Sequence, residues 1–184
     1  MVIVSFSQKA KKAMEGAKTR NQYFDIPKYF KFSEHEETPA TPALPLFFAL
    51  DEALKEILEE GVEGRIRRHE ICANAFYSGF ESLGLKAFAP LEIRSNTVIG
   101  ITYPSGIADN EFRALMDKKF GVLIAGGFGK LKGSMFRVGS MGLINQTMVT
   151  TTLDAIGQSL RYFNYTCDPT KALSVAWNEL KALG

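Results

Sequence analysis

The sequence has few of the residues that build disulfide frameworks and metal centres. It contains two cysteines, Cys72 and Cys167, and two histidines, His35 and His69. Two cysteines are too few for a disulfide framework or a zinc site, so we expect a reducing compartment, the cytoplasm. The histidines are distant in sequence, and neither has a partner at a spacing that suits a metal ion. We therefore expect no metal site.

Long apolar runs and a strong net charge are also missing. No apolar stretch approaches the roughly 20 residues of a membrane-spanning helix, and residues 1–6 lack the pattern of a secretory signal. The formal net charge of +2 favours neither a nucleic-acid nor a membrane partner. Hydrophobic residues make up 46% of the chain and charged residues 23%, as in soluble globular proteins that bury a core.

Familiar phosphate-binding and nucleophile motifs are absent as well. Gly127-Phe128-Gly129-Lys130 is followed by leucine and then by a strand pattern, whereas a phosphate-binding loop needs Ser or Thr and a helix. No nucleophile elbow occurs. The glycines at 126–129 are interpreted in two ways, as a tight connection between strands or as part of a pocket wall.

The first half of the chain is predicted to be mostly helical. Residues 2–6 indicate a buried strand, and Ser7 caps a helix that ends near Glu15. Residues 17–42 are mostly irregular, with a single helical turn at 25–27. Helical periodicity starts at Ala43, and Gly61 separates two helices.

Each of these two long helices carries an apolar stripe that predicts a buried face. In the first helix the stripe comprises Phe47, Leu50, Leu54, Ile57 and Leu58, and in the second it comprises Val62, Ile66, Ala73, Phe76, Phe80 and Leu83. The charge cluster of Arg65, Arg67 and Arg68 is interpreted as a solvated helix face.

The second half alternates between strand and helix patterns. Strands are predicted at 97–103, 122–125 and 135–138, and helices at 111–119, 149–163 and 168–180. The order predicts a small α+β domain whose sheet is covered by helices.

Several segments, in this order along the chain, resemble the class V pyridoxal-phosphate (PLP) aminotransferases. They are residues 4–11, 23–29, 38–42 with 48–50, 126–129 and 136–142. The group includes alanine–glyoxylate and serine–pyruvate aminotransferases. The resemblance implies that residues 43–184 form the C-terminal small domain of the PLP-dependent transferase fold (fold type I), with a short mixed or antiparallel sheet. Residues 1–42 would be a strand, helix and loop that lead out of a large PLP domain.

The resemblance also implies roles for individual residues. Arg137 would bind the α-carboxylate of the amino-acid substrate, because a guanidinium offers a carboxylate two parallel donors. The alternative is a structural arginine paired with Asp or Glu. Thr41 and Thr38 would reach the PLP phosphate of a partner subunit, with simple loop capping as the alternative. Ser140 departs from the family, in which histidine is common at this place.

Lys9 stands in a Ser-Gln-Lys context that is typical of the family's cofactor lysine. A helix pattern follows Lys9 and the strand pattern precedes it, so we expect the cofactor lysine to be missing from this chain. The parent would exchange an amino group between serine or alanine and pyruvate or glyoxylate, as a PLP-dependent homodimer. We expect this chain alone to be inactive and to bind no PLP covalently. The alternative is a non-catalytic interaction or assembly module derived from the same domain.

Overall fold

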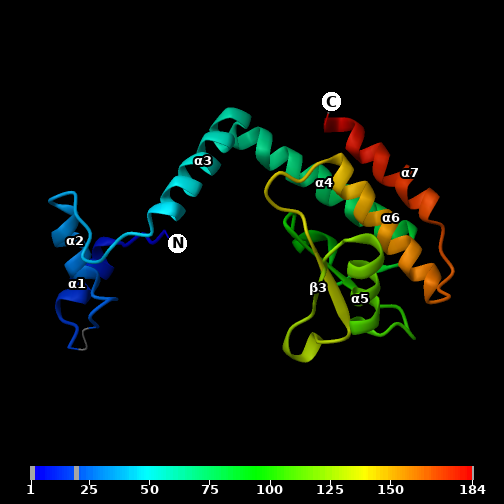
Figure 1. Ribbon diagram of the computed structural model, residues 1–184, viewed down its shortest axis with the longest axis horizontal. Helices are drawn as coiled ribbons and strands as arrows, with labels where there is room; N and C mark the ends of the chain where they lie inside the picture. The colour runs from blue at the N-terminus through cyan, green and yellow to red at the C-terminus, as the bar shows by residue number, and fades with distance from the viewer. Residues whose placement is uncertain (1–2, 19–20, 184) are drawn as a thin grey trace. The chain divides into compact units, whose positions relative to one another are not determined.

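The computed structural model describes residues 3–18 and 21–183, and these fall into two compact units, Met1–Glu59 and Glu60–Gly184 (Figure 1). The boundary predicted from the sequence lies earlier, after residue 42. The difference arises at helix α3 (Leu44–Glu60), which has no buried residue. The buried core of the second unit begins only at Cys72, in the next helix.

The first unit contains α1 (Gln8–Glu15), α2 (Ile26–Ser33) and most of α3. The cap predicted for the first helix is confirmed, since the Ala10 N–H donates to Ser7 Oγ at 3.2 Å. The turn predicted at 25–27 extends into the eight-residue helix α2, because apolar and aromatic residues continue the helical pattern after Pro27. The rings of Phe6 and Phe30 meet edge to face at 5.7 Å and join the segment before α1 to α2.

The strand predicted at residues 2–6 is wrong for the residues that the structure describes. Residues 3–7 form no strand, and Ile3 and Val4 are exposed; Val2 lies outside the described residues. A strand needs a partner for its backbone hydrogen bonds. No neighbouring strand pairs with this segment in the described chain.

The second unit is built on a four-stranded antiparallel sheet with the order β1-β2-β4-β3. The strands are β1 (Lys86–Ala87), β2 (Val98–Thr102), β3 (Ala125–Gly126) and β4 (Met135–Gly139). The central strands β2 and β4 were predicted. The strand predicted at 122–125 is reduced to the two residues of β3, and β1 was not predicted.

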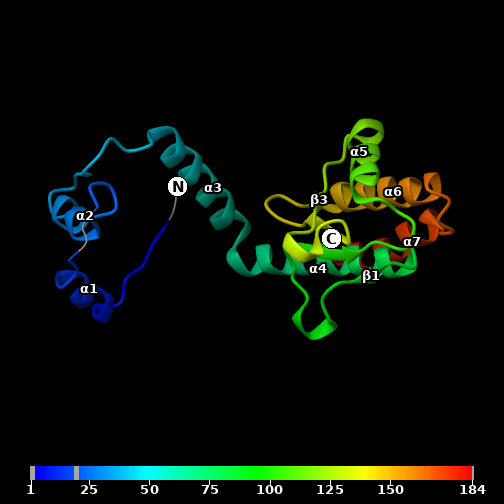
Figure 2. The same cartoon turned by 90° about the horizontal axis from the view of Figure 1, so that it is seen from below.

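Four helices surround this sheet, namely α4 (Val62–Ser82), α5 (Asp109–Phe120), α6 (Gln146–Tyr162) and α7 (Pro169–Leu180). Helices α6 and α7 pack against each other and against α4 (Figures 1 and 2). Single-turn helices at Leu91–Ile93, Gly129–Leu131 and Lys181–Leu183 complete the unit. The predicted α+β class, with helices covering a short sheet, is confirmed.

The core lies where α4 and α5 meet the sheet. Phe136 of β4 contacts Phe80 of α4 and Phe112 of α5, with ring centroids 6.0 and 5.8 Å apart. All three rings are fully buried. Burying a large side chain of this kind contributes about 1.5–3 kcal/mol, so this aromatic cluster is a main source of the stability of the second unit.

The buried stripes predicted for the two long helices are only partly confirmed. Ala73, Phe76 and Phe80 of α4 are buried, whereas Val62 and Ile66 in its first turns are half exposed or more. Every residue of α3 is at least partly exposed, Leu58 by 75%. Within residues 3–18 and 21–183, no helix has both the length and the apolar character needed to cross a bilayer.

Candidate functional site

The two faces of the sheet differ in chemistry. Side chains alternate between the faces of a strand, so Ile99, Ile101 and Phe136 point into the core and are fully buried. Gly100 and Arg137 lie opposite each other in the register of β2 and β4, on the other face. The arginine that the resemblance marked is therefore turned away from the core.

Arg137 is held by two contacts from the segment that precedes β4. Its Nε–H donates to the Gly126 carbonyl oxygen at 2.8 Å. Its guanidinium carbon lies 4.1 Å from the centre of the Phe128 ring, within the range of a cation–π interaction. These contacts leave the terminal Nη groups without a hydrogen-bond partner in the described chain.

The alternative role, a structural ion pair, is not found for Arg137. Across residues 3–18 and 21–183, no carboxylate comes within ion-pair distance of its guanidinium. A guanidinium whose Nη groups are free is able to receive a carboxylate from a ligand end on, through two parallel hydrogen bonds.

The space beside Arg137 is a mostly apolar pocket of about 290 Å³. It is lined by Tyr77, Phe88, Ala89, Ile93, Ser95, Val98, Gly100, Gly127, Phe128, Leu131, Met135 and Arg137. Arg137 supplies the charge in this lining. A single cation among apolar walls is less screened by water than one on an open surface, so its attraction for an anion is stronger.

The glycines at 126–129 serve both of the roles considered for them. Gly129 has a φ of 51°, which a side chain disfavours, as expected for a tight connection. Gly127 and Phe128 also line the pocket. The segment is therefore a turn whose residues form one wall of the site.

The two threonines proposed for the PLP phosphate lie in the first unit, whereas Arg137 lies in the second. Both threonines are exposed. The Thr38 hydroxyl donates to the Ala40 carbonyl at 2.8 Å, a local loop contact of the kind considered as its alternative role. The structure describes these units separately, so it does not bring the threonines and the arginine into one site.

The pocket suits a substrate carboxylate better than it suits the coenzyme. PLP chemistry requires an amine that forms an imine with the coenzyme aldehyde, and the lining contains no lysine. Lys9 is exposed on α1 in the first unit, in the helix that the sequence predicted. The lining therefore offers a cation for a small acid and no amine for the coenzyme aldehyde.

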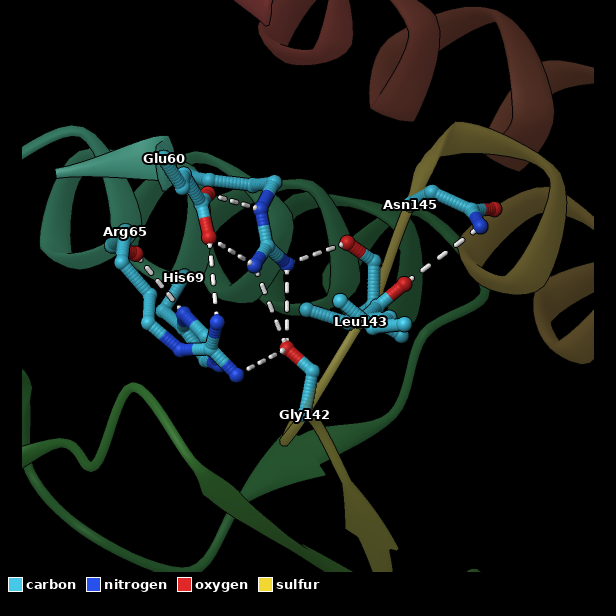
Figure 3. Close-up of polar contacts among 8 residues, drawn as sticks. Glu60, Arg65, His69, Gly142, Leu143 and Asn145 are labelled. Atoms are coloured by element: carbon cyan, nitrogen blue, oxygen red, sulfur yellow. Dashed lines mark hydrogen bonds and ion pairs between the residues drawn. The ribbon is translucent and has the colours of Figure 1, made fainter. Parts of the chain in front are cut away.

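The interpretation of the arginine cluster of α4 as a solvated face is wrong for two of its three members. The Arg65 and Arg68 side chains are only 20% and 18% exposed, and both form ion pairs with Glu60. Both also donate to the Gly142 carbonyl, and Arg68 donates to the Ile144 carbonyl at 2.7 Å (Figure 3). These bonds fasten the loop that follows β4 to α4.

The remaining polar residues of interest have structural contacts. His69 Nδ1 lies 2.7 Å from the Arg65 carbonyl oxygen. Cys72 is fully buried in α4, and burial raises the pKa of its thiol. Because the thiolate is the nucleophilic form, this cysteine is poorly suited to catalysis.

Two residues that shape the pocket, Phe128 and Gly100, were not among the predicted site residues. Phe128 is an aromatic residue inside a glycine-rich turn, and Gly100 interrupts a β-branched strand. A glycine within a strand signals close approach by another group. Here a Cβ at position 100 would lie 2.7 Å from Met135 Cε, so the glycine leaves room for the Met135 side chain, which lines the pocket.

Comparison with known sequences finds several aminotransferases, together with proteins named as soluble hydrogenase subunits. No protein-family model matches the chain. It is 39% identical over 144 residues to an uncharacterised aminotransferase of Methanocaldococcus jannaschii, covering 78% of this chain and 37% of that protein. It is 31% identical over 164 residues to a serine–glyoxylate aminotransferase of Methylorubrum extorquens, covering 86% and 41%. The chain spans less than half the length of these relatives.

Comparison with solved structures finds the same enzymes. The ureidoglycine–glyoxylate aminotransferase of Bacillus subtilis superposes with a TM-score of 0.89 at 27% identity, over 96% of this chain and 47% of that one. An alanine–glyoxylate aminotransferase of Nostoc superposes with a TM-score of 0.81 at 26% identity, over 85% and 43%. The chain therefore matches the C-terminal part of PLP-dependent aminotransferases of the serine–glyoxylate and alanine–glyoxylate type, as its sequence motifs indicated.

Proposed function

We propose that this chain is the C-terminal portion of an aminotransferase and is inactive by itself. The whole enzyme would move an amino group between a small amino acid, such as serine or alanine, and a 2-oxo acid, such as pyruvate or glyoxylate. The observation that carries this proposal is the Arg137 guanidinium, which faces an apolar pocket and has no acidic partner in the described chain.

Arg137 would bind the carboxylate that amino acids and 2-oxo acids share. Its Nη groups would donate to the two carboxylate oxygens, while the Gly126 carbonyl and the Phe128 ring hold the guanidinium in place. The pocket volume of about 290 Å³ suits a small acid. The names of similar proteins, which include serine–glyoxylate and alanine–glyoxylate aminotransferases, support the same substrate class.

The coenzyme would be held mainly by residues outside this chain. The whole enzyme would be a homodimer in the cytoplasm. When bound, PLP supplies an electron sink for the amino-group transfer. Thr41 and Thr38 would contribute hydroxyl donors to its phosphate in the partner subunit. For Thr38 this requires exchange of its present bond to the Ala40 carbonyl.

The carboxylate-binding role is tested by titrating the chain with pyruvate and following its amide resonances. We expect Arg137→Ala to weaken binding by about 10–100-fold, because a hydrogen bond to a charged group contributes about 1.5–3 kcal/mol. The pyruvate affinity of Arg137→Lys should lie between those of the wild type and Arg137→Ala, because lysine keeps the charge and loses the planar guanidinium. Arg67→Ala removes an exposed arginine that is not part of the pocket lining and is the matched control. Equal affinity of the wild type and Arg137→Ala would contradict the proposal.

The proposed lack of activity is tested by adding PLP and removing the excess by gel filtration. We expect no retained coenzyme absorbance and no transamination of glyoxylate with serine. Absorbance that is retained by the wild type and lost in Lys9→Ala would show that Lys9 holds the coenzyme after all. Activity that returns on addition of a large-domain fragment would support the C-terminal-portion proposal.

A non-catalytic assembly module is the second candidate. It is favoured by the exposed apolar residues of α3, among them Phe47, Phe48, Leu54 and Leu58. Isolation of a stable complex with an unrelated chain, together with no activity in the presence of a large-domain fragment, would support this module over the aminotransferase.

A further inference from the structure

The backbone of Gly126 lies between the Arg137 guanidinium and the partly buried ion pair of Asp109 and Arg113. Its carbonyl accepts the 2.8 Å bond from Arg137 Nε. A Cβ built on Gly126 would lie 3.2 Å from Asp109 Oδ2 and 3.3 Å from Arg113 Nε. The Asp109–Arg113 pair therefore packs directly against the α-carbon of the residue that holds Arg137.

The Asp109 carboxylate is fixed by three hydrogen bonds. Arg113 donates from Nε to Oδ1 at 2.9 Å and from Nη2 to Oδ2 at 2.8 Å, and Tyr103 donates from its hydroxyl to Oδ1 at 3.0 Å. The Asp109 side chain is 8% exposed. A bidentate pair of this kind has a defined geometry as well as a favourable energy, so it forms a rigid surface.

The protonation states of Asp109 and Tyr103 favour the hydrogen bonds of this cluster. The adjacent Arg113 guanidinium lowers the pKa of Asp109, which therefore stays ionised near neutral pH. Burial raises the pKa of the Tyr103 hydroxyl, which therefore keeps its proton and remains a donor. The Tyr103 ring also packs between Phe112 and Phe136, at centroid distances of 5.5 and 5.1 Å.

Apart from α5, the strand that carries Gly126 is held by its pairing with β4. Strand β3 is two residues long, pairs only with β4 and lies at the edge of the sheet. Leu123, just before it, is 80% exposed. Short edge strands have unpaired backbone groups on one side and few neighbours. Packing from α5 is therefore a main restraint on the Gly126 carbonyl.

We propose that Asp109 and Arg113, assisted by Tyr103, are positioning residues that hold the Gly126 carbonyl and thereby orient the Arg137 guanidinium toward its ligand. This rests on the carboxylate-binding role proposed for Arg137. The cluster itself is not part of the pocket lining, so it acts through the backbone of β3.

The test measures hydrogen exchange of the Arg137 Nε–H by nitrogen-15 NMR, together with pyruvate affinity and thermal stability, in the whole chain. The resonance is assigned by its loss in Arg137→Lys. Gly126→Ala wedges a methyl group between β3 and the ion pair, and Tyr103→Phe removes one bond to Asp109 but keeps the aromatic ring. Gly139→Ala adds the same methyl group to β4, where it would meet only the flexible end of Met141 at 3.4 Å, and is the matched control.

We expect Gly126→Ala to accelerate Nε–H exchange by about tenfold, which corresponds to the loss of one hydrogen bond of about 1–1.5 kcal/mol. Pyruvate binding should weaken several-fold in the same variant. Tyr103→Phe should change both quantities in the same direction but less, and Gly139→Ala should change neither. A purely structural pair would lower the melting temperature without accelerating Nε–H exchange in the folded state.

Unchanged Nε–H exchange in both Gly126→Ala and Tyr103→Phe would overturn the positioning role. If Gly126→Ala fails to fold, Tyr103→Phe decides the question, because its core packing is retained. The wild-type chain could fail to bind pyruvate while Nε–H exchange is still faster in the variants. This result would support the positioning role and contradict the carboxylate-binding proposal. The two proposals therefore fail separately.

Discussion

Gly127 illustrates how a single residue fixes the shape of the pocket wall. Its N–H donates to the Met135 carbonyl at 3.0 Å, at the end of the pairing between β3 and β4. A Cβ at this position would lie 2.7 Å from the Leu131 carbonyl carbon and closer still to its oxygen. Because both atoms belong to the backbone, the neighbour has no easy way to move aside. Glycine is required here for space, and its φ is not in the left-handed region.

We expect Gly127→Ala to destabilise the second unit by about 1–3 kcal/mol, the usual cost of overpacking. The reason is that the turn at Gly129–Leu131 has to shift to admit the methyl group. Urea denaturation followed by circular dichroism measures the change. Gly139→Ala, which meets only a flexible side chain, should change the free energy of unfolding by less than about 0.5 kcal/mol. An equal effect of both substitutions would contradict this account of Gly127.

At the scale of elements, Arg68 connects three parts of the second unit. It donates to Glu60, at the end of α3, and to the carbonyls of Gly142 and Ile144, in the loop that joins β4 to α6. The adjacent Arg68 guanidinium lowers the pKa of Glu60, so this carboxylate is ionised at neutral pH. The arginine thus satisfies two carbonyls of a loop that has no regular structure of its own (Figure 3).

Replacement of Arg68 by methionine should loosen this loop. We expect a loss of about 1.5–3 kcal/mol of stability, the range for hydrogen bonds to charged groups, and faster amide exchange at residues 140–145. Hydrogen–deuterium exchange with mass spectrometry measures the second effect. Arg67→Met, on the exposed side of the same helix, is the control and should leave both quantities nearly unchanged. If the loop remains as protected in Arg68→Met as in the wild type, the arginine does not restrain it.

At the scale of the whole molecule, helix α3 exposes more apolar surface than is usual for a helix that contacts only water. Leu54 and Leu58 are four residues apart, so they share one face of the helix, and they are 45% and 75% exposed. Contiguous exposed apolar surface commonly marks a contact with another chain or domain. This agrees with a chain that spans less than half the length of its aminotransferase relatives.

We expect the isolated chain to self-associate through this surface, with a second copy covering it. Sedimentation velocity should show species larger than a monomer that dissociate on dilution. The double variant Leu54→Glu/Leu58→Glu should remain monomeric, because paired copies would bury unpaired charges. Leu123→Glu changes an 80% exposed leucine in the second unit and should leave association unchanged. A wild-type chain that is monomeric at every concentration would refute the prediction.

Many elements of the fold could be predicted from local patterns. Caps at Ser7 and Asp168 and the break at Gly61 are encoded within a few residues, and the structure has helices that begin at Gln8, Val62 and Pro169. Strand β1 could not be predicted and the bounds of β3 were misplaced, because two residues are too short to show a period. Burial on α3 was mispredicted because an apolar stripe shows only that a helix can be covered.

The sequence by itself determined the main helices, the two central strands, the α+β class and the motif that contains Arg137. Only the tertiary structure distinguished the arginines from one another. Arg68 is bound to carbonyls more than seventy residues away, Arg113 to a buried aspartate, and Arg137 to a backbone carbonyl and an aromatic ring beside a pocket. The three side chains are chemically identical, but Arg68 binds carbonyls of a distant loop, Arg137 binds the turn just before its own strand, and Arg113 pairs with Asp109 one turn away on its own helix.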